Sequence, residues 1–199
     1  MSAMIDRHVA VSIYGIVLSA GAGSRFLGAD HKLTATLRGR PVVAWAVDAA
    51  LAADLAGVIV VTGAVTLDLP AEVIEINNHR WAEGQATSLQ LGLAAAAARG
   101  ADAVVVGLGD QPFVTAAAWS AVAHSTAAIA VATYNGVRGN PVRLGRSVWP
   151  LLPATGDQGA RGLMALRPEL VSQVACIGSA ADIDTMEDLR QWNSSTNSP

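Results

Sequence analysis

Short, nearly continuous apolar runs alternate along the chain with longer runs rich in Ala and Leu. Continuous apolar runs are typical of strands covered on both faces, and the longer runs have the length of helices. This alternation predicts an α/β fold with a mostly parallel central sheet. Strands are expected at residues 11–18, 57–62, 72–77, 103–108, 129–134 and 171–177, with a further short strand at 142–144.

Helices are expected between these strands, at residues 41–53, 85–99, 115–124, 146–152 and 159–166, and from residue 185 onward. Pro41 suits a first helical position, Thr115 can cap a helix start, and Gly100 suits a helix end. Turn-forming residues from 135 to 141 predict a loop. Because the chain has no repeat and no long linker, residues 1–193 are expected to form one domain and residues 194–199 a disordered tail.

Composition restricts the function classes. With 52% hydrophobic and 15% charged residues among 199, the chain should fold. Its net charge of −3 and the absence of a basic run argue against a nucleic-acid partner. Cys176 is the only cysteine, which excludes a disulfide framework, and no apolar run reaches the length of a membrane span. We therefore expect a cytoplasmic protein with no membrane partner.

Three loops follow expected strands and carry unusual chemistry. Residues 19–32 are rich in glycine and include Arg25 and Lys32, residues 109–112 include Asp110, and residues 182–185 include Asp182 and Asp184. In open α/β sheets, ligands bind at the carboxyl ends of strands. Backbone N–H groups, two cations and several carboxylates are the parts needed to hold a triphosphate and its magnesium.

Two better-known phosphate signatures do not fit the glycine-rich loop. The dinucleotide fingerprint would need glycine where Phe26 stands, which argues against an NAD-dependent oxidoreductase. The P-loop would need Lys and then Ser or Thr where Ala29 and Asp30 stand. Taken alone, the loop is equally compatible with an ordinary strand-to-helix turn, and Asp184 or Thr185 can serve simply as a helix cap.

Eight motifs in order carry a family resemblance. They are LSAGAGSRF at 18–26, KL at 32–33, GRP at 39–41, EGQATSL at 83–89, GDQP at 109–112, RGNPV at 138–142, GDQGAR at 156–161, and DIDT at 182–185 followed by EDL at 187–189. The set resembles the MobA-like nucleotidyltransferases, and most of all their molybdenum cofactor cytidylyltransferase branch. It spans residues 13–189, nearly the whole chain.

The resemblance implies a three-layer, Rossmann-like nucleotidyltransferase fold. It also implies transfer of a nucleoside monophosphate from an NTP, with CTP favoured, to a phosphate-bearing acceptor such as molybdopterin-type cofactor, with release of pyrophosphate. Mg²⁺ or Mn²⁺ would be the metal cofactor, and a molybdoenzyme client a further partner. Because an acceptor phosphate is already ionised at neutral pH, no general base is needed.

The resemblance also assigns residues. The catalytic residues would be Arg25, Lys32 and Asp110. The metal ligands would be drawn from Asp110, Asp182 and Asp184: Asp110 would hold the metal, with Asp182 or Asp184 as the second carboxylate. The nucleotide would be bound by Leu18, Ala20, Gly21, Ala22, Gly23, Ser24, Arg25, Lys32, Gly84, Ser88 and Asp110. The acceptor would be bound by Arg138, Asn140, Pro141, Asp157 and Arg161. Arg138 also belongs to a local basic cluster with Arg143 and Arg146, which is either a solvated face or part of the acceptor site.

Two alternatives stay open at this point. One is the same chemistry with GTP or another phosphorylated acceptor. The other is a non-catalytic chaperone or insertion factor for molybdenum cofactor. The four histidines lack ligand-like spacing and are expected to be ordinary surface or core residues. Lys32 is the only lysine beside twelve arginines, and the resemblance places it at the end of the phosphate-facing loop. A compact ammonium suits a triphosphate there, so an exchange for arginine should not be neutral.

Overall fold

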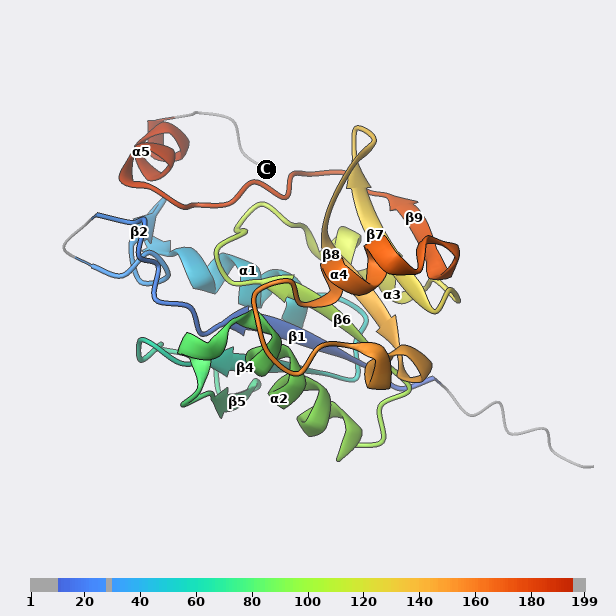
Figure 1. Cartoon of the computed structure of the whole chain (residues 1–199). Coiled ribbons are helices and arrows are strands. Elements are labelled where there is room, and N and C mark those ends of the chain that lie inside the picture. Colours follow the sequence, from blue (N-terminus) through green and yellow to red (C-terminus); the bar gives the residue numbers. More distant parts are fainter. Residues whose placement is uncertain (1–10, 28–29, 195–199) are drawn as a thin grey trace, which may run out of the picture.

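A seven-stranded sheet forms the centre of the molecule, in the order β5-β4-β1-β6-β8-β7-β9 (Figure 1). The computed structural model describes residues 11–27 and 30–194. The strands are β1 (Ile13–Ser19), β4 (Gly57–Thr62), β5 (Ile74–Asn77), β6 (Ala103–Leu108), β7 (Ile129–Tyr134), β8 (Val137–Gly145) and β9 (Val171–Ala175). Only β8 is antiparallel to its neighbours, which confirms the expected mostly parallel sheet.

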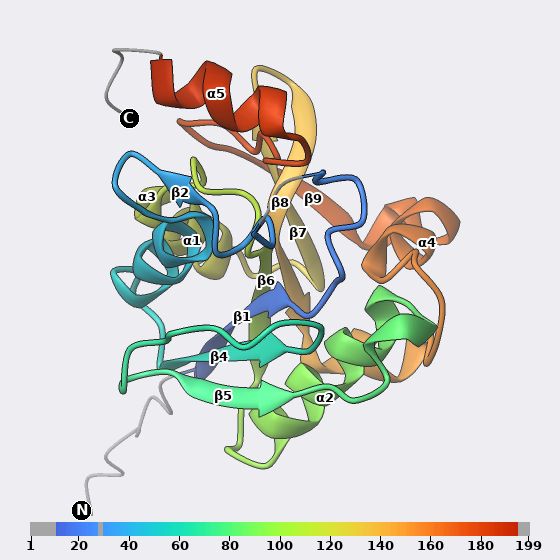
Figure 2. The same ribbon diagram turned by 90° about the vertical axis from the view of Figure 1, so that its left-hand side faces the viewer.

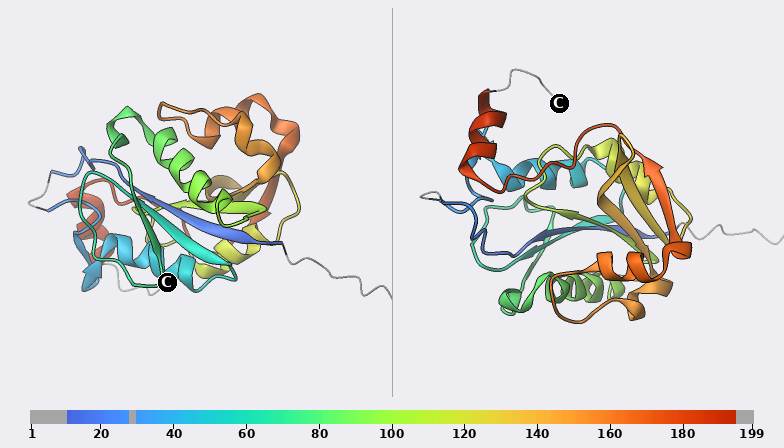
Figure 3. Two further views of the ribbon diagram at one scale, coloured as in Figure 1. Left: turned by 90° about the horizontal axis from the view of Figure 1, so that it is seen from below. Right: turned by 45° about the horizontal axis from the view of Figure 1, so that its top comes forward.

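Helices cover both faces of this sheet and give the molecule three layers (Figure 3). Helices α1 (Val42–Leu51) and α3 (Ala116–Ala123) pack on one face. Helices α2 (Gln85–Ala97) and α4 (Ala160–Leu166) pack on the other, together with a 3₁₀ helix at Arg146–Leu151. Shorter 3₁₀ turns occupy Trp81–Glu83 and Pro168–Leu170. Both faces of the central strands are therefore buried, as continuous apolar runs require.

A small subdomain sits at the carboxyl edge of the sheet. The two-residue strands β2 (Thr36–Leu37) and β3 (Arg40–Pro41) form a hairpin, and α5 (Met186–Ser194) packs against it (Figure 2). A separate apolar cluster joins these parts, in which Phe26 and Ile183 are both buried. This cluster brings the loop after β1 next to the segment before α5, although more than 150 residues separate them.

Glycines allow a large aromatic residue to lie flat under two strands. Trp119 of α3 is 1% exposed, and a Cβ atom at Gly107 of β6 would lie 2.5 Å from its ring. A Cβ at Gly15 of β1 would also contact this ring, at 3.7 Å. Helix α3 is thereby held close to the centre of the sheet, beneath the two strands that bear the candidate site.

Most expected elements agree with the structure, including the cap of α3 by Thr115, whose hydroxyl accepts from the Ala118 amide. A loop was expected from 135 to 141 and a short strand at 142–144; the strand at 142–144 is confirmed and residues 135–136 form a turn, but the loop expected at 137–141 is wrong. Strand β8 runs from Val137 to Gly145 without a break. Pairing with both β6 and β7, with a register shift between Val131 and Ala132, overrides the turn-forming residues in its first half.

Ser194, the first residue of the expected tail, ends α5, and the rest of that tail lies outside the described residues. Across residues 11–27 and 30–194, no helix is both long and apolar enough to cross a membrane.

Candidate active site

The candidate site lies at the point in the sheet where the order of successive strands reverses. Strand β1 is paired on one side with β4 and on the other with β6, so the loops that follow β1 and β6 leave the same edge and diverge. Such a switch point is where open α/β sheets bind ligands. The backbone amide of Ile183 donates to the carbonyl of Asp110, which adds the segment before α5 to the same place. The three loops expected to carry the chemistry therefore do meet.

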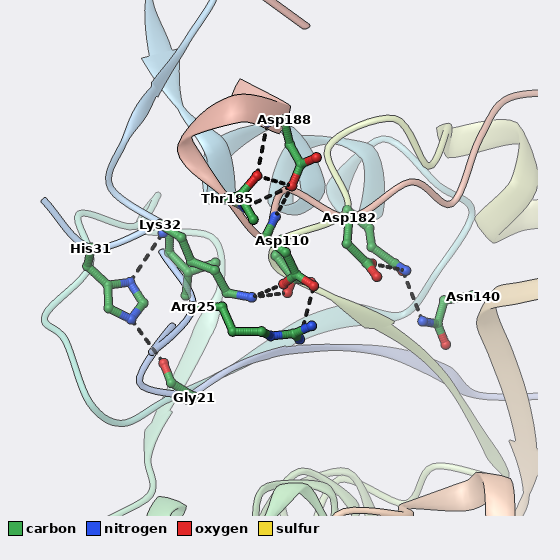
Figure 4. Close-up of polar contacts among 12 residues, drawn as sticks. Gly21, Arg25, His31, Lys32, Asp110, Asn140, Asp182, Thr185 and Asp188 are labelled. Carbon is green, nitrogen blue, oxygen red and sulfur yellow. Dashed lines mark hydrogen bonds and ion pairs between the residues drawn. The ribbon is translucent and has the colours of Figure 1, made fainter. Parts of the chain in front are cut away.

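Lys32 is the centre of an ion-pair network (Figure 4). Its Nζ lies 2.5 Å from Oδ2 of Asp110 and 3.0 Å from Oδ1 of Asp184, and its side chain is only 13% exposed. Burial alone would lower the pKa of Lys32, but the charges and hydrogen bonds of Asp110 and Asp184 outweigh it and raise the pKa above its usual 10.5. The ammonium group therefore stays charged at neutral pH.

Arg25 adds a second cation at the solvent side of this network. Its guanidinium lies 3.0 Å from Oδ2 of Asp184, while its side chain is 77% exposed. The next residue, Phe26, is buried against Ile183, which anchors this part of the loop. The Arg25 side chain thus lies at the solvent-exposed edge of the network, where a ligand can reach it.

A capping box at the start of α5 holds Asp184 in place. The carboxylate of Asp188 accepts from the backbone amides of Asp184 and Thr185 and from the Thr185 hydroxyl, while the Asp188 amide donates to that hydroxyl. The hydrogen bonds from Thr185 lower the pKa of Asp188, despite a small opposing effect of burial. The expected capping at Thr185 therefore exists, and it leaves the Asp184 side chain available to Lys32 and Arg25.

Asp182 faces a different partner. Its Oδ1 accepts from Nε2 of Gln111 at 2.6 Å, and Gln111 Oε1 accepts from Nδ2 of Asn140 at 2.9 Å. Burial raises the pKa of Asp182, and the hydrogen bond from Gln111 acts against this rise. Figure 4 shows Asp182 turned toward Asn140, away from the Lys32 network.

The donor set suits a divalent ion that is shared with phosphates. Oδ1 of Asp110 is buried without a hydrogen-bond partner, which leaves a lone carboxylate oxygen available as a ligand. Within the part of the chain that the structure describes, no group of three His, Cys, Asp or Glu side chains is arranged to hold a metal ion by itself. The two candidates for the second carboxylate have different surroundings: Asp184 shares Lys32 with Asp110, whereas Asp182 contacts Gln111. Magnesium commonly uses one or two carboxylates plus substrate phosphates, and Asp110 with Asp184 fits that pattern.

A cavity of about 800 Å³ opens beside this network. Apolar side chains of the α2 face line much of it, among them Leu18, Leu89 and Val142. Of the expected acceptor residues, Arg138, Asn140 and Arg161 line the cavity. Pro141 is buried in β8, and Asp157 instead accepts from the Gln85 amide at 3.4 Å, so neither lies on the cavity wall.

The local basic cluster is split by the fold. Only Arg138 lines the cavity. Arg143 is 8% exposed and donates to the carbonyl of Ala127, and Arg146 donates to the carbonyl of Ala101 and lies over the ring of Trp149. Alternation along β8 separates Arg143 from Arg138, so the three do not form one phosphate-binding surface.

The start of α2 forms a rigid corner near the cavity. Gly84 has a φ of 105°, and a Cβ there would lie 2.5 Å from the backbone of Gly156, so only glycine fits. Ser88 is buried, and its hydroxyl accepts from Nδ2 of Asn78 at 2.9 Å. Asn78 also donates to the hydroxyl of Thr87. Sequence reasoning named Gly84 and Ser88 but missed Asn78, which fixes their geometry.

The glycine-rich loop is partly exposed and is closed by a histidine. Gly21, Ala22 and Ser24 are exposed, whereas Ala20 is buried. His31, to which no role was given, has its Nε2 3.0 Å from the carbonyl of Gly21 and its Nδ1 accepting from the Leu33 amide. Only a neutral ring that is protonated at Nε2 can make both hydrogen bonds. His31 thus fastens the end of the loop that carries Lys32 to its beginning.

Similarity to known proteins agrees with this architecture. The chain is 30% identical to the purine catabolism protein PucB of Bacillus subtilis over 195 residues, which cover 88% of this chain and 93% of PucB. It is 39% identical over 108 residues to the bifunctional enzyme IspD/IspF of Caulobacter vibrioides, covering 50% of this chain. The matched part spans only 28% of that enzyme.

A solved structure, that of Rv0371c from Mycobacterium tuberculosis H37Rv, superposes with a TM-score of 0.77 at 29% identity, covering 94% of this chain and 99% of Rv0371c. Rv0371c has also been crystallised as a complex with manganese, which matches with a TM-score of 0.74. The sequence pattern of the MobA-like NTP transferase domain matches residues 15–174. The chain therefore belongs to the MobA-like NTP transferase family.

Proposed function

We propose that this chain transfers a nucleoside monophosphate, preferably from CTP, to a phosphate-bearing acceptor of the molybdopterin type and releases pyrophosphate. The observation that carries the proposal is a chain of ion pairs beside the cavity that Arg138 and Arg161 line. In this chain Asp110 pairs with Lys32, Lys32 with Asp184, and Asp184 with Arg25. One side of the site can hold a triphosphate, and the other can hold a second, anionic molecule against it.

The reaction needs positioning and neutralisation of charge more than proton transfer. Lys32 and Arg25 would bind the β- and γ-phosphates and stabilise the charge that develops on departing pyrophosphate. Asp110 and Asp184 would hold the divalent ion, which supplies positive charge at the phosphates when bound. Arg138 and Arg161 would orient the acceptor so that its phosphate oxygen faces the α-phosphorus.

The ion pairs explain how such a site stays stable without ligand. Lys32 is neutralised by Asp110 and Asp184, and Asp110 keeps its second oxygen, Oδ1, without a hydrogen-bond partner and available to a metal. With a metal–nucleotide complex, Asp110 and Asp184 would face the positive charge of the metal, and Lys32 and Arg25 would face the negative charge of the phosphates. We therefore expect nucleotide and metal to bind much more tightly together than either does alone.

The preference for CTP rests on the loop sequence LSAG at 18–21, which resembles the CTP-using branch in having Ala20 before Gly21. Ala20 is 5% exposed, and a Cβ added at Gly63 would come within 2.8 Å of its methyl group. The methyl group therefore fills this corner of the loop completely. The acceptor assignment rests on the motifs of residues 138–142 and 156–161 and on the cavity wall that Arg138 and Arg161 share.

The decisive assay supplies purified protein with each NTP in turn, Mg²⁺ or Mn²⁺, and molybdenum cofactor, and measures pyrophosphate. Release with CTP above the other nucleotides supports the proposal. Release of pyrophosphate with GTP, or only with other phosphorylated acceptors, would indicate another nucleotidyltransferase activity within the same family. Absence of release with every NTP, together with intact delivery of cofactor by an Asp110→Ala variant, would point to a non-catalytic chaperone.

A further inference from the structure

The two aspartates that flank Ile183 serve different parts of the site. Ile183 is fully buried, so the carboxylates of Asp182 and Asp184 both lie on the side facing the site. Yet Asp184 contacts Lys32 and Arg25, whereas Asp182 contacts Gln111. Asp182 lines the 800 Å³ cavity, and neither Asp184 nor Asp110 does.

Gln111 is what holds Asp182 there. It is 5% exposed, and its side-chain Nε2 donates to Asp182 and, at 3.0 Å, to the carbonyl of Ala180. Its Oε1 accepts from the amide of Asn140. The Gln111 amide has two acceptors, Asp182 and the Ala180 carbonyl, on one side and one N–H donor, from Asn140, on the other. Only one orientation of the amide satisfies all three partners.

This amide is fixed relative to both halves of the site. Gln111 directly follows Asp110, and its own backbone amide donates to the carbonyl of Leu108 at the end of β6. Asn140 lies on β8, where its backbone carbonyl accepts from the hydroxyl of Tyr134. Tyr134, Asn140, Gln111 and Asp182 therefore form a hydrogen-bonded wall of the cavity, anchored at the end of β6, next to Asp110. Figure 4 shows Asn140 and Asp182 on this side of the site.

We propose that Gln111 is a positioning residue that gives the two aspartates separate roles. It keeps Asp182 out of the metal centre and presents it, with Asn140, to a hydrogen-bond donor on the acceptor. The proposal rests on the proposed function, because it names what the acceptor must offer beside its phosphate, namely an N–H or O–H group. Asp184, with Asp110, is left as the carboxylate pair for the metal.

The first arm of the test measures metal binding and needs no acceptor. Mn²⁺ affinity is measured by electron paramagnetic resonance in the presence of a non-hydrolysable CTP analogue, for wild type, Asp182→Asn and Asp184→Asn. We expect Asp184→Asn to weaken Mn²⁺ binding at least tenfold and Asp182→Asn to leave it within about twofold. Equal losses of Mn²⁺ affinity in the two variants would overturn these separate roles of Asp182 and Asp184, whether or not the wild type turns over any acceptor.

The second arm measures binding of molybdenum cofactor to the protein loaded with the same analogue, by calorimetry. We expect Asp182→Asn to weaken this binding about tenfold, because a charged acceptor of a hydrogen bond is lost. Gln111→Glu should weaken it similarly, since two adjacent carboxylates repel each other. In the double variant, Asn at 182 can donate to the new carboxylate, so its loss should equal that of Asp182→Asn alone.

Gln173→Glu, on the exposed face of β9, is the matched control for the added charge and should change neither affinity. Additive losses in the double variant, or unchanged cofactor binding in Asp182→Asn, would contradict the role of Gln111. If wild type binds cofactor but releases no pyrophosphate with any NTP, the proposed function fails. Both arms of the test still show whether Asp182 and Asp184 have separate roles.

Discussion

The proposed phosphate side and the proposed acceptor side of the site, called the phosphate side and the acceptor side below, are built from different kinds of groups. On the phosphate side, Lys32, Arg25, Asp110 and Asp184 lie within 3.0 Å of their ionic partners. On the acceptor side, Gln111 and Asn140 form a neutral amide chain over an apolar wall. The first arrangement is strongly paired and must rearrange to bind charge, whereas the second is already formed.

This difference predicts how each side responds to substitution. Exchange of a charged group on the phosphate side leaves its buried partner without compensation, so the effects there should be large. The acceptor side contributes single hydrogen bonds and partly exposed arginines, whose loss should change acceptor affinity by smaller factors. The four substitutions that follow test this contrast.

The largest effect is expected for Asp110→Asn. The variant keeps the shape of the side chain but removes the charge that pairs with Lys32 and the free Oδ1 that suits a metal. We expect the rate of pyrophosphate release to fall about 10²- to 10³-fold. The exposed Asp68→Asn serves as the matched control and should keep the wild-type rate. A rate within twofold of wild type would show that the phosphate side does not depend on this carboxylate.

A smaller but clear loss is expected for Lys32→Arg. The ammonium group is a compact charge enclosed between two carboxylates, and a planar guanidinium cannot occupy the same position without displacing one of them. We expect kcat/KM for the nucleotide to fall about 10- to 100-fold, with the KM for the acceptor unchanged.

Lys32→Met, which removes the charge, should be at least as impaired as Lys32→Arg. Wild-type turnover in the arginine variant would mean that the single lysine of the chain is a coincidence of composition.

The same contrast explains what could be predicted from the sequence. Lys32, Arg25 and Asp110 stand in short motifs next to strand ends, and the apolar runs were strong enough to place those ends within two residues. Parallel pairing then brings the loops together, so the phosphate side followed from local pattern and sheet topology. The choice between Asp182 and Asp184 as the second metal carboxylate stayed open, because sequence spacing cannot show that Asp182 hydrogen-bonds to Gln111 while Asp184 contacts Lys32.

The acceptor side depended on contacts that have no local signal. Strand β8 was obscured by Gly139, Asn140 and Pro141, and its pairing between β6 and β7 is decided by tertiary packing. Gln111 was part of a recognised motif without a role, since its partners lie 29 and 71 residues away. Asn78 could have been found only as a polar residue directly after a strand, facing the start of the next helix.

On the acceptor side, Arg161→Ala should reduce acceptor affinity and leave the nucleotide unaffected. Arg161 lines the cavity at the start of α4, where its guanidinium can donate to an anionic acceptor. We expect the KM for the acceptor to rise about tenfold at constant KM for the nucleotide. Arg167→Ala, at the end of the same helix and paired with Glu169 outside the cavity, is the control. A matching rise in the KM for the nucleotide would erase the distinction between the two sides.

The smallest effect is expected for Asp188→Ala, which removes the capping box beneath Asp184. Loss of such a cap costs about 1 kcal/mol of stability. The pKa of Asp188 is lower in the folded protein than in the unfolded chain, so its contribution is fully present above about pH 4 and is lost as the pH falls through the folded value.

Urea unfolding at pH 7 and pH 3 should therefore show a smaller stability difference between wild type and Asp188→Ala at pH 3 than at pH 7. Glu187→Ala, exposed in the same helical turn, is the control and should differ little from wild type at either pH. Because the box orients Asp184 and not Asp182, Asp188→Ala should raise the KM for the nucleotide a few-fold while the KM for the acceptor stays constant. An increase confined to the acceptor would place Asp184 on the acceptor side and invalidate the contrast between the two sides.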